Sequence, residues 1–319
     1  MGQRIEEIKD RIAGCLWGQA IGDALGLGTE FMQKEEVMEN YPYECGLSEY
    51  SQIVQDSHRR MWDRGDWTDD TDMMLCIARA IISDHCINPT TVAHNFKKWF
   101  TGIPMGIGQL TYTVLGLSDY EEKPEKAAEA VWRFYGSKNA ANGGVMRTSV
   151  VGLWNENVAL NAENICKLTH ADPRCIGSCV IISELINSLV WQDKELSFEE
   201  LLQIGNKYDS RIKPYLERAM NGFLEDFELD DEQTMGYTIK TMGCAIWCLF
   251  HVNSFKEGLL KVVNAGGDAD TNAAVTCAVL GAKYGKKGIP EHYIQGLKRK
   301  DEYDGMIRQL TDILMDKFM

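Results

Sequence analysis

Apolar residues recur along this chain with the period of an α-helix. From Met73 they fall at positions i, i+1, i+4, i+7 and i+8, which places Met73, Ile77 and Ile81 on one stripe of an amphipathic helix. The same periodicity predicts helices over seven further stretches: 4–24, 90–101, 124–135, 173–191, 234–250, 268–284 and 302–318. Alternation with a period of two is almost absent, and only 45–55 leaves open a short strand or an irregular loop. The pattern predicts an all-α fold.

Two segments differ from this amphipathic pattern. After its first few positions, the stretch 268–284 is small and apolar on every face, which predicts a helix at the centre of the molecule. The stretch 225–232 carries six acids in eight positions. It lacks the central glycine and the ligand spacing of an EF-hand, so we expect a solvated loop rather than a calcium site.

Composition narrows the class of protein. With 319 residues, 45% of them hydrophobic and 25% charged, the chain can bury a full core. No stretch rich in Pro, Ser or Gly separates two halves, so we expect a single domain over 1–319. The formal net charge of −14 repels phosphate backbones and anionic lipid, which disfavours nonspecific nucleic-acid binding. The longest strongly apolar run, 244–250, falls far short of the roughly 20 residues of a membrane span.

The cysteines and the first residues favour a cytoplasmic location. The N-terminal segment lacks the apolar core of a signal peptide. The ten cysteines include no C-x-x-C pair, and a chain of this length does not need disulfide bonds to fold. We therefore expect the cysteines to be reduced and to pack in the core. The pattern gives no indication of the oligomeric state.

Carboxylates crowd the starts of two predicted helices. Three aspartates stand in 67–72 and two in 266–272: Asp69, Asp70, Asp72, Asp268 and Asp270. One acid at a helix start is explained as an N-cap that favours the positive end of the helix dipole. Several ionised carboxylates beside an apolar helix repel one another and lose hydration, unless a cation lies between them.

We therefore expect the two helix starts to meet around divalent metal ions. The ligands would all be oxygens, from Thr68, Asp69, Asp70, Asp268, Asp270 and Thr271. Hard oxygen ligands without His or Cys favour Mg²⁺ or Mn²⁺ over zinc and copper. Four carboxylates carry a charge of −4, which two divalent ions neutralise, so the count favours a two-metal site. The alternative is two independently capped helices that bind no metal.

A glycine-rich stretch precedes a further acid. Gly18, Gly22 and Gly26 share one helical face, whose usual purpose is the close approach of a second helix; a phosphate-binding loop is the weaker alternative. Glu30 follows these glycines. It is a candidate general base or extra metal ligand, against the alternative of an ordinary surface residue.

Two polar loops are candidates for substrate binding. The loop 142–147 sets adjacent glycines beside an amide and a guanidinium, a combination that binds phosphate or sugar hydroxyls, in Asn142, Gly143, Gly144, Met146 and Arg147. The alternative is a plain loop before a helix over 145–154. Further on, Asp172 and Pro173 predict the N-cap and first turn of a helix. His170, just before it, either contacts an anion or is structural.

In this order the motifs resemble those of the ADP-ribosylglycohydrolase family. The match spans about 11–285 and includes the opening glycine-rich segment with its following Glu30. It continues through W-T-D-D-T at 67–71, N-G and M-R within 142–147, T-H and D-P-R within 169–174, and G-G-D and D-T within 266–271.

The resemblance implies a single-domain orthogonal helical bundle with a binuclear Mg²⁺ or Mn²⁺ centre. Carried onto matching positions, it implies six metal ligands: Thr68, Asp69, Asp70, Asp268, Asp270 and Thr271. Glu30 then occupies the position of the family's catalytic or metal-proximal glutamate. The loop from Asn142 to Arg147, together with His170, falls where similar proteins hold the phosphates and ribose of ADP-ribose.

The implied reaction is cleavage of the bond between the anomeric carbon of the distal ribose and an acceptor, in an ADP-ribosylated protein or a small ADP-ribose conjugate. The metals would chelate ribose hydroxyls and orient a water. Glu30, or one of the metal-site aspartates Asp69 and Asp268, would assist proton transfer. The alternative is a noncatalytic ADP-ribose-binding or immunity-type module on the same fold. The intact ligand set favours the enzyme.

Three positions depart from the family pattern. Asp72 replaces a frequent Gln and adds a third acid expected near the metals. Val150 replaces a Pro, which we interpret as a packing change. The stretch 106–108 reads Gly-Ile-Gly where similar proteins often have Asp-Ile-Gly, with the Asp near an arginine-type acceptor. The last departure weakens ADP-ribosyl-arginine as the expected substrate.

Overall fold

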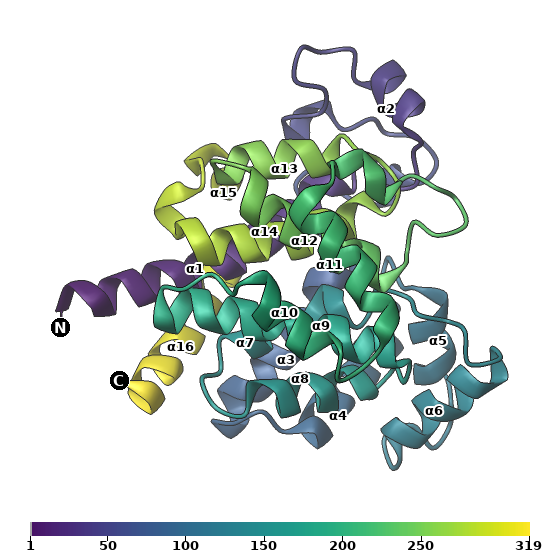
Figure 1. The fold of residues 1–319 in the computed structure, drawn as a ribbon, viewed down its shortest axis with the longest axis vertical. Helices are drawn as coiled ribbons and strands as arrows, with labels where there is room; N and C mark the ends of the chain where they lie inside the picture. The colour runs from purple at the N-terminus through teal and green to yellow at the C-terminus, as the bar shows by residue number, and fades with distance from the viewer. Residues whose placement is uncertain (1) are drawn as a thin grey trace.

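A computed structural model describes residues 2–319, and the regular structure within them is helical (Figure 1). Up to residue 167 the α-helices are α1 (Gly2–Gly26), α2 (Lys34–Asn40), α3 (Asp69–Asp84), α4 (Pro89–Thr101), α5 (Gln109–Leu115), α6 (Pro124–Phe134), α7 (Ser149–Gly152) and α8 (Val158–Lys167). The remainder contains α9 (Pro173–Asn187), α10 (Phe198–Gly205), α11 (Lys213–Asn221), α12 (Thr238–His251), α13 (Phe255–Val263), α14 (Ala269–Tyr284), α15 (Glu291–Gly296) and α16 (Lys300–Phe318). The predicted all-α class is confirmed.

The eight helices predicted from apolar periodicity are all present. α12 begins at Thr238 rather than at 234, because residues 232–236 form turns. The helix predicted over 145–154 is wrong in part: a 3-10 turn is followed by the short α7, because Thr148 adopts φ −91° and ψ 4° between them. The stretch 45–55 is an irregular loop around a 3-10 turn, so the loop alternative is confirmed.

The helices α1 and α14 run antiparallel, with their backbones in contact. A Cβ atom on Gly18 would lie 2.1 Å from the carbonyl oxygen of Cys277, and one on Gly22 would lie 2.2 Å from that of Ala273. Only residues without a side chain permit this approach. The predicted role of the glycine face in close helix packing is confirmed, and the antiparallel direction brings the end of α1 to the start of α14.

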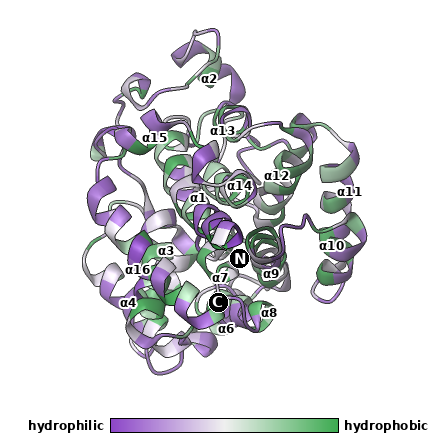
Figure 2. Cartoon of the chain, turned by 90° about the vertical axis from the view of Figure 1, so that its left-hand side faces the viewer, coloured by the Kyte–Doolittle hydropathy of each residue, from purple (hydrophilic) through white to green (hydrophobic). Residues whose placement is uncertain are grey.

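The buried apolar side chains form one cluster that extends from Ile8 to Met315. Every residue of α14 from Ala269 to Ala282 is buried, as predicted for a central helix. Figure 2 shows α9, α12 and α14 beside α1 in the middle of the bundle. The segment Pro173–Gln192 is long and apolar enough to cross a membrane, but 89% of that window is buried inside the fold, as in a central core helix.

Two smaller expectations are also met. All ten cysteines are free, and eight of them are buried. The acidic segment 225–232 runs through a 3-10 turn at Leu224–Phe227. The apolar side chains of that turn face the core, while the acids beside them lie at the surface, as expected of a solvated loop.

Candidate active site

One cavity lies where the C-terminal end of α1 meets the N-terminal ends of α3 and α14. The chain leaves α1 at Gly26 and reaches Glu30 beside the start of α14. α3 starts at Asp69 on the same cavity. The volume is about 250 Å³, and the wall includes every residue predicted as a metal ligand: Thr68, Asp69, Asp70, Asp268, Asp270 and Thr271. The fold thus brings together two acidic segments that are far apart in the chain.

Two groups of three carboxylates share Asp270. Oxygen atoms of Asp23, Asp70 and Asp270 lie within 4.8 Å of one another, and so do those of Glu30, Asp268 and Asp270. Asp70 and Asp270 are buried, and Oδ1 of each has no hydrogen-bond partner among residues 2–319. Leaving a buried charged oxygen unpaired is costly. Oxygen-coordinated divalent cations would satisfy both atoms, so the residues present fit a metal site.

The two residues at the N-cap positions of these helices do not cap them with their side chains. Thr68 and Asp268 occupy the N-cap positions of α3 and α14, and within the described chain neither side chain makes a cap hydrogen bond. The Thr68 hydroxyl instead lies 3.2 Å from Asp70 Oδ2 and 3.3 Å from Asp270 Oδ2. The alternative of two independently capped helices therefore does not describe this site.

Burial and mutual repulsion raise the pKa of these carboxyl groups. Burial is the larger cause for Asp70 and Asp270, whose pKa values lie well above the ordinary range, and neighbouring carboxylates raise them further. Burial, followed by the charges of Glu30 and Asp23, raises the pKa of Asp69 to about 7. A cluster of bare negative charges is thus unfavourable here, and nearby positive charge would relieve the repulsion.

Asp23, near the end of α1, organises the start of α3 and was not singled out from the sequence. Its Oδ1 accepts hydrogen bonds from the backbone N–H and the hydroxyl of Thr68, both at 2.9 Å. Its Oδ2 accepts from the N–H and the hydroxyl of Thr71, at 2.9 and 2.6 Å. Both oxygens are engaged, so Asp23 positions the acidic segment. The available signal was a single acid inside an otherwise apolar helical segment.

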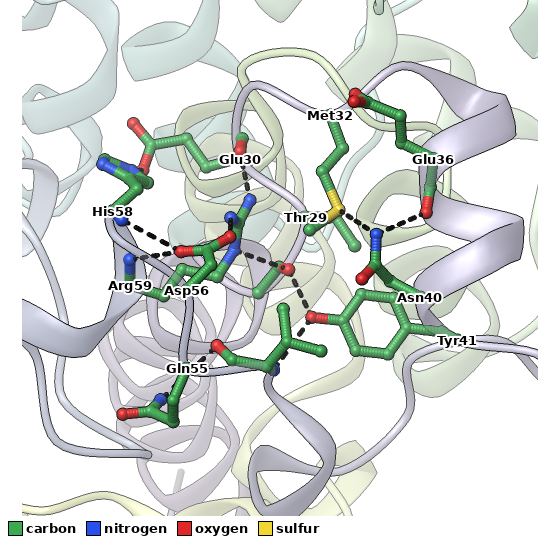
Figure 3. A network of polar contacts seen from close by, with 12 residues as sticks. Thr29, Glu30, Met32, Glu36, Asn40, Tyr41, Gln55, Asp56, His58 and Arg59 are labelled. Atoms are coloured by element: carbon green, nitrogen blue, oxygen red, sulfur yellow. Dashed lines mark hydrogen bonds and ion pairs between the residues drawn. The ribbon is translucent and has the colours of Figure 1, made fainter.

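Glu30 is held by the segment 56–59 (Figure 3). Nε2 of His58 lies 2.6 Å from Glu30 Oε2. The buried guanidinium of Arg59 donates to the backbone carbonyl of Glu30 and, at 2.8 Å, to that of Gly28, and it forms an ion pair with Asp56. Burial raises the pKa of Glu30, and the hydrogen bond with His58 opposes that shift. His58 and Arg59 were missed because 56–59 carries no helical periodicity.

Four of the residues predicted to bind substrate line the cavity: Asn142, Gly143, Met146 and His170. Nδ2 of Asn142 donates to Asp268 Oδ2 at 2.8 Å and to Thr241 Oγ1 at 3.1 Å. Asn142 therefore orients one of the site's carboxylates. The first turn of α9 forms as predicted, with Asp172 accepting from the backbone N–H of Arg174 at 2.9 Å.

Gly144 and Arg147 lie behind the cavity wall, which corrects the expectation that they face the ligand. A Cβ on Gly144 would meet the Sγ of Cys166 at 3.1 Å. The Arg147 side chain is fully buried and extends inward, where Nη2 donates to Thr169 Oγ1 at 2.6 Å. Its guanidinium carbon lies 4.5 Å from the ring centroid of Phe96. The Arg147 side chain thus makes its contacts in the protein interior and not in the cavity.

The family departures also have structural explanations. Asp72 accepts hydrogen bonds from the indole N–H groups of Trp67 at 2.8 Å and Trp99 at 3.2 Å, so its carboxylate is engaged by these side chains rather than by the cavity. Val150 is fully buried, in agreement with a packing change. Gly106 does line the cavity, and a Cβ there would lie 3.1 Å from Asp69 Oδ1. A larger residue at 106 would crowd that carboxylate.

Comparison with known proteins gives a consistent picture. The sequence model of the family ADP-ribosylglycohydrolase matches residues 4–318. The ADP-ribosyl-[dinitrogen reductase] glycohydrolase of Rhodospirillum rubrum is 26% identical, over 97% of this chain and 96% of that protein. The ADP-ribosylarginine hydrolase Tri1 of Serratia proteamaculans is 24% identical, over 95% of this chain and 80% of the relative.

A solved structure supports the fold. The chain of an ADP-ribosylglycohydrolase-related protein complex superimposes with a TM-score of 0.76 and 24% identity, over 97% of this chain and all of that one. The helical architecture, the converging carboxylates and the match over almost the whole length agree. The chain therefore belongs to the ADP-ribosylglycohydrolases, a family of hydrolytic enzymes.

Proposed function

We propose that this protein hydrolyses the glycosidic bond between ADP-ribose and an acceptor, and that it requires two divalent cations, Mg²⁺ or Mn²⁺. The observation that carries the proposal is the pair of three-carboxylate groups that share Asp270, with unpartnered oxygens on Asp70 and Asp270. The two relatives are named as an ADP-ribosyl glycohydrolase and an ADP-ribosylarginine hydrolase, and these activities support the bond class. The proposed substrate is an ADP-ribosylated protein or a small ADP-ribose conjugate.

The proposed ligands are the six oxygen-bearing side chains of the two helix starts, Thr68, Asp69, Asp70, Asp268, Asp270 and Thr271. Asp70 and Asp270 offer unpaired oxygens, while the Thr68 hydroxyl contacts both carboxylates. When bound, such cations supply Lewis-acid stabilisation of negative charge and a fixed anchor for sugar hydroxyls. Asp23 keeps the segment 68–71 in the geometry that this binding needs.

The reaction adds one water across the bond. Water oxygen bonds to the anomeric carbon of the distal ribose, the bond from that carbon to the acceptor breaks, and the acceptor leaves with a proton. The proposed catalytic carboxyls are Glu30, Asp69 and Asp268, which line one cavity and can accept or return that proton. Carboxylates beside the ribose also stabilise the positive charge that develops as the bond breaks.

The remaining cavity wall binds and orients the substrate. The proposed contacts are Gly143, Met146 and His170, and Asn142 holds Asp268 in place beside them. Burying the sugar against these groups fixes its orientation relative to the carboxylates. We also propose a cytoplasmic location, which the ten free cysteines support.

The test is release of free ADP-ribose from three conjugates: ADP-ribosyl-arginine, ADP-ribosyl-serine and O-acetyl-ADP-ribose. Each is assayed with Mn²⁺, with Mg²⁺ and with EDTA. We expect release of ADP-ribose from at least one conjugate, dependent on the added cation. Tight ADP-ribose binding without release from any conjugate would instead support the noncatalytic module. Turnover unaffected by EDTA after exhaustive dialysis would refute the metal requirement.

A further inference from the structure

His170 presents an unpaired nitrogen at the cavity wall. The side chain is 1% exposed, and Nε2 has no hydrogen-bond partner among the residues described. A Cβ on Gly143 would lie 3.1 Å from this nitrogen, so Nε2 packs closely beside Gly143, and both residues line the cavity. A buried polar atom of this kind calls for a partner, and the cavity is where a ligand supplies one.

The other ring nitrogen of His170 belongs to a chain of hydrogen bonds. Nδ1 lies 2.7 Å from Oγ1 of Thr169, and that same oxygen accepts from Nη2 of Arg147 at 2.6 Å. A guanidinium only donates, so the Thr169 oxygen is the acceptor in the second contact. The hydroxyl has one hydrogen, and among residues 2–319 the acceptor within hydrogen-bond distance is Nδ1 of His170.

The hydrogen bonds from Arg147 to Thr169 and from Thr169 to His170 fix the tautomer of the His170 imidazole. If Nδ1 carried the proton, it would donate to Thr169 Oγ1, and the buried Thr169 hydroxyl hydrogen would lose its acceptor, which is costly. With the hydroxyl donating to Nδ1, the single proton of the neutral ring resides on Nε2. Burial, with the charge of Arg147 adding to it, lowers the pKa of His170 well below its ordinary value, so the ring is neutral at pH 7.

Arg147 is suited to this role because no carboxylate among residues 2–319 pairs with its guanidinium, which lies instead over the ring of Phe96 and beside Sδ of Met73. It is fully buried, and burial lowers the pKa of its guanidinium, while a nearby phenol and three thiols oppose that shift: Tyr120, Cys76, Cys166 and Cys179. Besides the contact with Thr169, its Nη2 reaches the Ile165 carbonyl at 3.4 Å. A buried guanidinium without a carboxylate partner is unfavourable for stability alone, which points to a functional reason.

We infer that Arg147, acting through Thr169, is a positioning residue that holds His170 as the Nε2–H tautomer, so that His170 donates a hydrogen bond to an oxygen of the ligand in the cavity. That the ligand is the ADP-ribose moiety rests on the proposed function. The tautomer does not, since it follows from the hydrogen bonds of the protein alone. Arg147 thereby contributes to recognition without facing the cavity.

The experiment compares Thr169→Val, which keeps the shape and removes the hydroxyl, with Thr169→Ser, which keeps the hydroxyl. Protein labelled with ¹⁵N-histidine reports the tautomer by NMR, and a His170→Gln variant assigns the signal. We expect the Nε2–H form in the parent and in Thr169→Ser, and a mixture in Thr169→Val. ADP-ribose affinity should fall about tenfold in Thr169→Val and stay within about twofold in Thr169→Ser.

Circular dichroism melting confirms that each variant is folded. An Nδ1–H or protonated His170 in the parent would overturn the inference, as would an unchanged tautomer in Thr169→Val. An affinity loss of equal size in both variants would show a packing effect instead. If the parent neither binds ADP-ribose nor hydrolyses any conjugate, the proposed function fails, whereas the NMR result still decides the tautomer.

Discussion

At the scale of single residues, Asp270 is the side chain on which the site depends most. It belongs to both three-carboxylate groups, and its Oδ1 has no protein partner within residues 2–319. We expect Asp270→Asn to lower turnover by about a hundredfold or more, because a neutral amide binds cations poorly and contributes no charge to the transition state. Folding should survive, since the change removes a buried charge. ADP-ribose release and thermal melting are the measurements.

The matched control is Asp226→Asn, which makes the same chemical change at an exposed acid of the surface loop. This variant should retain full turnover. Asp268→Asn is expected to behave like Asp270→Asn, with loss of activity greater than loss of stability, and it leaves one amide oxygen in place of two carboxylate oxygens to accept from Asn142. Parental activity in either site variant would remove that aspartate from the proposed centre.

His58 gives a second prediction at this scale. Its Nε2 contacts the Glu30 carboxylate at 2.6 Å, so His58→Leu should free that side chain and lower kcat by about tenfold. His58→Gln offers an amide N–H at a similar reach and should recover most of the rate. KM and kcat are measured for both variants. Equal rates in the parent and His58→Leu would show that Glu30 needs no support from His58.

At the scale of elements, the contact between α1 and α14 sets the position of the site. A methyl group on Gly22 would lie 2.2 Å from the Ala273 carbonyl oxygen, so the helices would have to separate. We expect Gly22→Ala to destabilise the protein by at least about 1–3 kcal/mol. Because α1 leads directly to Glu30, activity should fall as well. Chemical denaturation and ADP-ribose release measure the two effects.

Gly305→Ala is the matched control, since Gly305 lies within α16 and a Cβ there would meet no atom of residues 2–319 within 4 Å. This change should be neutral or stabilise the protein by up to about 1 kcal/mol, because alanine favours helix. If the two substitutions have the same effect, backbone entropy rather than close packing determines the stability at Gly22.

Helix prediction succeeded where apolar residues repeat over several turns and failed where helices are short. The periodic stretches became α1, α3, α4, α6, α9, α12, α14 and α16. The short helices α5 and α15 were not predicted, because two turns present too few positions for a period to appear. The start of α12 was misplaced because turns precede Thr238, and these depend on tertiary contacts such as the hydrogen bond from Thr238 to the Ala140 carbonyl.

The acidic part of the candidate site could be predicted from the density of aspartates in the sequence. Clustered aspartates at two helix starts indicate a cation in any fold that brings them together, and the close match to family motifs suggested that they meet. For Arg147 the sequence was misleading, because a guanidinium beside glycines suggested a phosphate contact. Only the fold shows that its side chain turns inward to Thr169. Direction of a side chain relative to a cavity depends on packing that sequence periodicity does not encode.

At the scale of the whole molecule, cation binding should couple to stability. The carboxylates come from α3, α14 and the segment after α1, so a cation that binds them ties together segments that separate on unfolding. A ligand that binds only the folded state at a hundred times its Kd adds about 2.7 kcal/mol. For a chain of this size, this corresponds to a rise in Tm of about 4 °C. Melting in EDTA, Mg²⁺ and Mn²⁺ provides the measurement.

The net charge of −14 means that any cation also screens repulsion across the surface, so the specific effect must be separated from the general one. Sodium chloride at matched ionic strength supplies that control and should raise Tm much less than millimolar Mn²⁺. In Asp270→Asn the Mn²⁺ effect should shrink to the sodium chloride level, while screening stays intact. A full Mn²⁺ response in that variant would place the stabilising cations elsewhere on the molecule.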